Sequence, residues 1–117
     1  MHELSVATAI VERAGELARA QGTDAVGEVR VRVGELSGVV PEALDFAFEV
    51  ARQGTVLDRA RLVVEHVTAR AWCGPCGETF PVGMPPFFWC PRCDRPSQEL
   101  RCGRELEIVA VEAGAPG

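Results

Sequence analysis

Four of the five cysteines form two closely spaced pairs in the second half of this 117-residue chain. The pairs are Cys73–Gly74–Pro75–Cys76 and Cys90–Pro91–Arg92–Cys93, and 13 residues separate them. Two Cys-x-x-Cys elements at this separation can place four sulfurs around one tetrahedral ion. Zinc suits such a site, because thiolates are soft ligands and Zn²⁺ accepts a closed tetrahedron without redox chemistry. The spacing therefore predicts zinc bound by Cys73, Cys76, Cys90 and Cys93, with an iron–tetrathiolate centre as the chemical alternative.

The first pair, preceded by Trp72, also matches the redox loop of thioredoxin-like enzymes. In those enzymes the N-terminus of a long helix lowers the pKa of the attacking thiol. Here residues 77–86 contain three prolines and two glycines, and such a segment cannot form that helix. A second Cys-x-x-Cys pair would also have no role in a dithiol enzyme. The sequence therefore favours metal binding over a thiol–disulfide oxidoreductase.

The N-terminus, Met1–His2–Glu3, has two interpretations. One is a frayed terminus with a solvated histidine. The other is a chelate in which the α-amine, the backbone nitrogen of residue 2 and its imidazole bind one ion in a plane. Ni(II) and Cu(II) favour planar nitrogen ligands and promote the loss of the amide proton, whereas zinc prefers a tetrahedron.

The elements that must position these residues follow from the hydrophobic pattern. Apolar residues from Leu4 to Ala18 recur at helical spacing, and this helix should end near Gln21. Pro41 opens a second helix that runs to about Arg52, whose apolar residues indicate extensive burial. Strands are predicted at 28–33, where apolar and charged residues alternate, at 62–71 and at 105–112.

This order predicts an α+β fold in which two helices pack on a three-stranded sheet, with an inserted zinc-ribbon-like module. We expect a discontinuous domain of residues 1–70 plus 104–117 and a zinc-binding domain of residues 71–103. The two strands that flank the module could pair as its supports. The module has few sizeable apolar residues, so it should depend on its metal for folding. The tail from Gly114 to Gly117 is expected to be disordered.

Composition narrows the class of protein. The net charge is −5, and residues 72–103 contain three arginines and three acidic residues. A module without a basic face is a poor candidate for binding nucleic acid. No apolar run approaches the roughly 18 residues of a membrane span, and charged residues interrupt the N-terminus where a signal peptide would lie. We therefore expect a cytoplasmic protein with reduced cysteines.

Several motifs together resemble the HypA family of nickel metallochaperones for [NiFe]-hydrogenase maturation, also known as HypA/HybF. They are Met1–Ser5, the segment from Gly34 to Leu44, Phe46–Glu49, the two cysteine pairs, and Gly103–Leu106. They cover nearly the whole chain in the family's order. The resemblance implies that His2 is the essential nickel ligand, supported by the Met1 amine, with Glu3 as an auxiliary ligand. It also implies that the four paired cysteines hold a structural zinc.

The resemblance implies a protein that is not an enzyme and that delivers Ni(II) with a GTPase accessory protein to the hydrogenase large subunit. It would bind neither nucleic acid nor membrane, and it would be a monomer or a weak homodimer. Some relatives carry histidines beside the zinc cysteines, but this chain has none after His66, so an all-thiolate zinc site is expected. His66 is expected to be an ordinary strand residue, and Cys102 a free side chain. The alternatives are a zinc-ribbon adaptor without metal transport and the oxidoreductase considered above.

Overall fold

The computed structural model describes residues 2–97 and 99–114. The chain divides into two compact units, which are considered separately. The helical unit contains Met1–Arg32, Val39–Glu65 and Glu107–Gly117. The cysteine unit contains Val33–Gly38 and His66–Leu106. Within the described residues, no helix is long and apolar enough to cross a membrane.

Two helices, α1 (Glu3–Ala20) and α2 (Pro41–Ala51), belong to the helical unit and pack against each other. The buried face of α1 repeats at helical spacing, with Ala7, Val11, Ala14 and Ala18 on it. Pro41 occupies the first turn of α2, where a missing N–H costs no hydrogen bond. Both helices begin and end within about two residues of the predicted positions.

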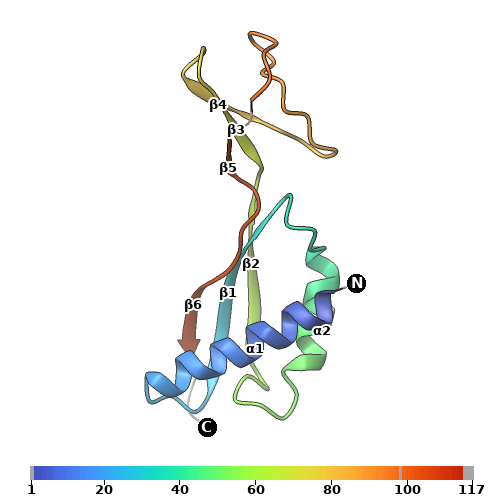
Figure 1. The fold of residues 1–117 in the computed structure, drawn as a ribbon. Helices are drawn as coiled ribbons and strands as arrows, with labels where there is room; N and C mark the ends of the chain where they lie inside the picture. The colour runs from blue at the N-terminus through green and yellow to red at the C-terminus, as the bar shows by residue number, and fades with distance from the viewer. Residues whose placement is uncertain (1, 98, 115–117) are drawn as a thin grey trace. The chain divides into compact units, whose positions relative to one another are not determined.

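A three-stranded sheet accompanies the helices, and its order is β2 (Arg61–Val67), β1 (Val26–Gly34), β6 (Leu106–Ala113) (Figure 1). Arg61, the first residue of β2, forms an ion pair with Glu28 near the start of β1, and Glu65 of β2 forms one with Arg32 near the end of β1. The two strands therefore run parallel. The α+β fold with two helices and a three-stranded sheet is confirmed. The expected pairing of the strands that flank the cysteine segment is wrong, because β1 lies between β2 and β6.

The second sheet lies in the cysteine unit, in the order β4 (Glu78–Pro81), β3 (Arg70–Cys73), β5 (Leu100–Cys102). Strand β3 is antiparallel to both neighbours. The single strand expected at 62–71 is therefore wrong, because the chain leaves one sheet after Val67 and enters another at Arg70. At the break, the N–H of buried Ala69 donates to the carboxylate of Glu35 at 2.9 Å. This hydrogen bond gives a partner to a buried N–H that is paired in neither sheet.

Each unit buries its own apolar residues. In the helical unit the alternation of β1 is confirmed, with Val29 and Val31 buried between charged neighbours. On α2, Leu44 and Phe48 are buried, but Phe46 is 70% exposed and Val50 47% exposed. The expected extensive burial of α2 is therefore wrong for the face that carries Phe46 and Val50, because the helix is packed only on the face that carries Leu44 and Phe48. The core of the cysteine unit is small and includes two cysteines among its buried residues: Ala69, Ala71, Cys73, Phe80, Val82 and Cys90.

Candidate metal centres

A β-hairpin positions the first cysteine pair. Cys73 is the last residue of β3, and Cys76 lies in the turn before β4. The turn closes with the N–H of Gly77 donating to the carbonyl of Cys73 at 2.8 Å, and Gly77 has a φ of 68°, which glycine adopts without strain. The sequence predicts that no helix follows Cys76, and the structure has strand β4 there. The helix N-terminus that activates a thioredoxin-type thiol is therefore missing at this position.

A second tight turn positions the other pair. The N–H of Asp94 donates to the carbonyl of Cys90 at 2.8 Å, and the N–H of Cys90 donates to the carbonyl of Arg95 at 2.9 Å. Asp94 completes the turn with a φ of 57°, a conformation that aspartate tolerates better than most residues. The two turns therefore share one construction, in which the backbone folds back onto the first cysteine of the pair.

The four sulfurs of the two turns form one cluster. The Sγ atoms of Cys73 and Cys93 are 3.5 Å apart, those of Cys76 and Cys90 are 3.9 Å apart, and all four lie within 4.8 Å of one another. A tetrahedron with zinc–sulfur bonds of about 2.3 Å has edges of about 3.8 Å. These separations are far longer than a disulfide bond of about 2.05 Å, and all five cysteines of the chain are free. The donor set therefore fits a tetrahedral zinc ion, with all four positions supplied by the protein.

The thiols of this cluster differ in acidity. Backbone N–H groups of Cys93 and Arg92 donate to Cys90 and lower its pKa to about 7, against the opposing effect of burial. The N–H of Cys76 likewise lowers the pKa of Cys73, but burial and hydrogen bonds with neighbouring sulfurs outweigh it, and the net pKa is raised. Hydrogen bonding with Cys73 and burial raise the pKa of Cys76 to about 12. Four sulfurs this close cannot all ionise without a cation among them, and a bound dication would favour all four thiolates.

The other candidate ligands lie at the start of α1, in the helical unit. His2 is exposed and is the N-cap of α1, and its carbonyl accepts a hydrogen bond from the N–H of Val6 at 3.0 Å. The amine expected from Met1 lies outside the described residues. Glu3, in contrast, is only 9% exposed, and its Oε2 accepts a hydrogen bond from the N–H of Val40 at 3.3 Å.

The contact between Glu3 and Val40 was not foreseen from the sequence. Val40 is the N-cap of α2, and its apolar side chain cannot accept a hydrogen bond from the first turn of the helix. A helix that starts without a capping side chain signals that another part of the chain supplies an acceptor. A carboxylate at this position also interacts favourably with the positive ends of α1 and α2.

Two further residues lie apart from the cysteine cluster. The thiol of Cys102 donates to the carbonyl of Thr68 at 3.3 Å, and Cys102 does not belong to the group of four sulfurs. His66 is exposed on β2. These positions agree with the expectations of a free cysteine and an ordinary strand histidine.

The fold and the cluster define a small α+β metal-binding protein with a four-cysteine module of the zinc-ribbon type. Residues 1–113 match the family model HypA, described as "Hydrogenase/urease nickel incorporation, metallochaperone, hypA". The chain belongs to this family of nickel-incorporation metallochaperones, as the resemblance in its motifs implies.

Similar proteins agree with this assignment. The chain is 50% identical over 112 residues to the hydrogenase maturation factor HypA of Streptomyces avermitilis, in an alignment that covers 95% of this chain and 86% of that protein. It is 45% identical over 112 residues to the HypA of Chloroflexus aurantiacus, covering 96% and 98% of the two chains. The solution structure of the nickel metallochaperone HypA from Helicobacter pylori has the same fold, with a TM-score of 0.68, 24% identity and coverage of 99% and 100%.

Proposed function

We propose that this protein binds Ni(II) at its N-terminus and delivers it during the maturation of [NiFe]-hydrogenase, while a structural zinc holds the cysteine unit together. The imidazole of His2 is the principal nickel ligand. The Met1 amine and local backbone nitrogens complete a planar set, and the Glu3 carboxylate is an auxiliary ligand. Cys73, Cys76, Cys90 and Cys93 hold the zinc. Membership of the HypA family and the exposure of His2 at the start of α1 support this assignment.

The position of His2 at a helix start suits the chemistry that nickel requires. The first N–H groups of an α-helix have no partner within the helix, so the backbone nitrogens of His2 and Glu3 can lose their protons without breaking helical hydrogen bonds. A cation at this end would be repelled by the helix dipole. Each amide that is deprotonated on binding brings a negative charge and cancels part of this repulsion.

The two metals have different roles because their sites differ in access. The cysteine cluster supplies four protein ligands, so an ion there has no open coordination position for a partner's ligand, and two of the four, Cys73 and Cys90, are buried. The imidazole of His2 is exposed, and a partner's ligands can replace it stepwise. Nickel is therefore the cargo, and zinc is a resident cofactor that stabilises the fold of its turns.

The proposed partners are those that the resemblance to the family implies. The protein acts in the cytoplasm with a GTPase accessory protein and passes nickel to the hydrogenase large subunit. It catalyses no reaction of its own, so GTP hydrolysis belongs to the accessory protein. It works as a monomer or a weak homodimer.

Nickel titration of the tag-free protein tests this proposal. The wild type and His2→Ala are compared by calorimetry at neutral pH, with His66→Ala as a matched control because His66 is also exposed in the described structure. We expect His2→Ala to bind nickel at least tenfold more weakly and His66→Ala to bind it normally. Equal nickel affinity of the wild type and His2→Ala would refute the N-terminal site.

A further inference from the structure

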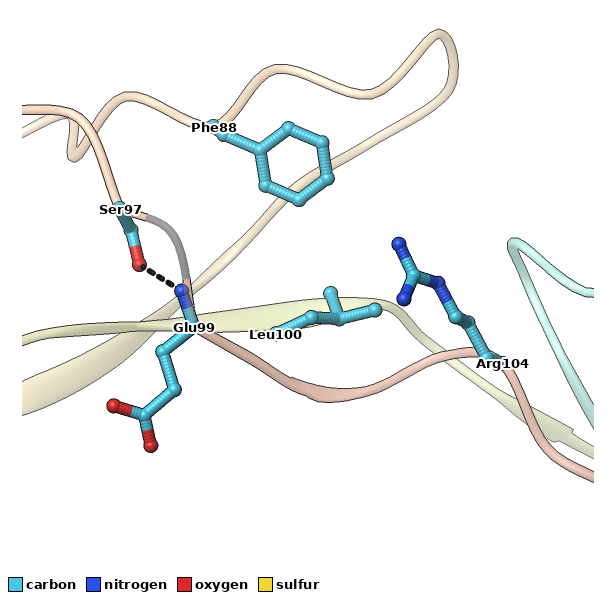
Figure 2. A pocket seen from close by; sticks show the side chains of 5 residues that line it. All are labelled: Phe88, Ser97, Glu99, Leu100 and Arg104. Carbon is cyan, nitrogen blue, oxygen red and sulfur yellow. Dashed lines mark hydrogen bonds between the residues drawn. The ribbon is translucent and has the colours of Figure 1, made fainter.

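The cysteine unit has a cavity of about 450 Å³ that lies apart from the sulfur cluster. Phe88, Ser97, Glu99, Leu100 and Arg104 line it. Its size is within the range of about 300–1,000 Å³ that is typical of ligand pockets. Figure 2 shows the guanidinium of Arg104 reaching back toward the side chain of Leu100, on the side where the ring of Phe88 lies. The cavity thus combines two apolar walls with one cationic group.

Within the described residues, Arg104 is the arginine of the cavity lining and its side chain has no partner, unlike those of Arg70, Arg92 and Arg101. Arg101 is paired with Glu99 at 3.0 Å and lies 4.6 Å from the centre of the Trp72 ring. Arg92 pairs with Glu78, and Arg70 donates to the hydroxyl of Thr79 at 2.9 Å. Within residues 2–97 and 99–114, Arg104 makes no hydrogen bond or ion pair. Its five donors are therefore available to a molecule that enters the cavity.

The backbone on both sides of Arg104 is held firmly. The carbonyl of Gly103 accepts a hydrogen bond from the N–H of Leu36 at 2.6 Å, and the N–H of Gly103 donates to the carboxylate of Glu105 at 2.7 Å. The carbonyl of Glu105 accepts a hydrogen bond from the N–H of Gly34 at 2.7 Å. Arg104 is thus a cation on a fixed backbone, so binding a ligand there has to order its side chain but not the main chain.

The chemistry of the lining selects the ligand. Ser97 and Arg104 are the lining side chains that can donate, and the hydroxyl of Ser97 already donates to the carbonyl of Trp72 at 2.5 Å. A guanidinium fork matches a carboxylate, which it binds with two parallel hydrogen bonds. Capture of a chain's terminal carboxylate usually relies on several backbone N–H groups, and phosphate groups are usually bound by clusters of arginines, whereas Arg104 is the single arginine of this lining. These features favour one side-chain carboxylate next to an aliphatic group.

We propose that this cavity is a docking site for a partner segment in which a glutamate follows a leucine or a similar aliphatic residue. The aliphatic side chain lies between Phe88 and Leu100, and the glutamate carboxylate binds the guanidinium of Arg104. The site does not depend on nickel or on His2, so it is separate from the nickel-binding function proposed above.

Titration of the zinc-loaded, nickel-free protein with the capped dipeptide acetyl-Leu-Glu-amide tests the site. The readouts are the ¹⁵N–¹H signals of the Leu100 and Arg104 amides and of the Arg104 side-chain Nε–H. We expect saturable shifts at these groups. Arg104→Gln should weaken binding at least fivefold, and Arg95→Gln should not, because Arg95 is also exposed but does not line the cavity.

Two further dipeptides identify what the site recognises. Acetyl-Leu-Gln-amide lacks any carboxylate, and acetyl-Leu-Gln with a free C-terminus has only the terminal one. Both should bind at least fivefold more weakly than acetyl-Leu-Glu-amide. Equal binding of the neutral peptide, equal or tighter binding of the peptide with the terminal carboxylate, or full affinity in Arg104→Gln would each overturn the proposal.

Discussion

The carboxylate of Glu3 accepts a hydrogen bond from the N–H of Val40, which joins the first turn of α1 to the N-cap of α2. The contact links residues that are 37 positions apart in the sequence. Because Glu3 directly follows His2, this hydrogen bond also fixes the backbone that carries the proposed nickel ligand. A bond from the Glu3 carboxylate to nickel would have to coexist with this contact or replace it.

Replacement of Glu3 should loosen both helix starts. We expect Glu3→Ala to lower the urea midpoint of unfolding and to speed amide hydrogen exchange in the first turn of α2, because a buried acceptor is lost. Glu12→Ala is the matched control, since Glu12 is an exposed residue of the same helix. Equal exchange in the two variants would show that the contact with Val40 does not stabilise α2.

Glu3→Gln separates the structural role of Glu3 from its role as a ligand. The glutamine amide oxygen can still accept the hydrogen bond from Val40, so this variant should keep the exchange rates of the wild type. We expect its nickel affinity to fall by less than that of His2→Ala, because a neutral amide is a weaker ligand than a carboxylate but the imidazole remains. A loss of affinity as large as that of His2→Ala would make Glu3 a principal ligand.

Nickel binding should weaken as the pH falls, because protons compete with the metal for the nitrogen ligands. An imidazole that takes up a proton cannot bind a metal, and protons also compete for the terminal amine and the backbone nitrogens. Titrations at several pH values should therefore give a steadily rising dissociation constant in the wild type. In His2→Ala the dependence should be shallower, and an identical slope in both proteins would contradict imidazole ligation.

The sequence predicted some parts of this structure and missed others for identifiable reasons. The helices, the alternating strand β1 and the cysteine cluster depend on local spacing, which the sequence displays directly. Strands β4 and β5 have only four and three residues, too few for a periodic pattern to emerge. The chain leaves the first sheet at Thr68, where the carboxylate of Glu35 accepts a hydrogen bond from the next backbone N–H, and Glu35 is distant in the sequence. The exposure of Phe46 depends on which face of α2 finds a packing partner, and an apolar composition does not specify that.

Removal of zinc should unfold the cysteine unit and spare the helices. Two of the six buried residues in its core are cysteines, so its apolar contacts alone are few. A structural zinc contributes on the order of 10–16 kcal/mol in small metal modules. We expect chelation, or Cys90→Ser, to change the fluorescence of Trp72 and Trp89, both of which lie in this unit, while most of the helical circular dichroism remains. Unchanged tryptophan fluorescence would contradict a structural role for zinc. The same measurement tests whether the expected domain of residues 71–103 unfolds separately from the expected domain of residues 1–70 plus 104–117.

The close approach of Gly34 to Gly103 provides a final prediction about the cysteine unit. A Cβ atom at Gly34 would lie 2.2 Å from the carbonyl oxygen of Gly103, well inside van der Waals contact, and the obstacle is backbone that cannot move aside. Gly34→Ala should therefore destabilise the unit by about 1–3 kcal/mol or more, the usual range for overpacking. Gly74→Ala is the control, because its Cβ would meet no atom closer than Nε1 of Trp72 at 3.9 Å. Urea unfolding followed by tryptophan fluorescence measures both variants, and equal midpoints would show that the backbone around Gly103 is free to shift.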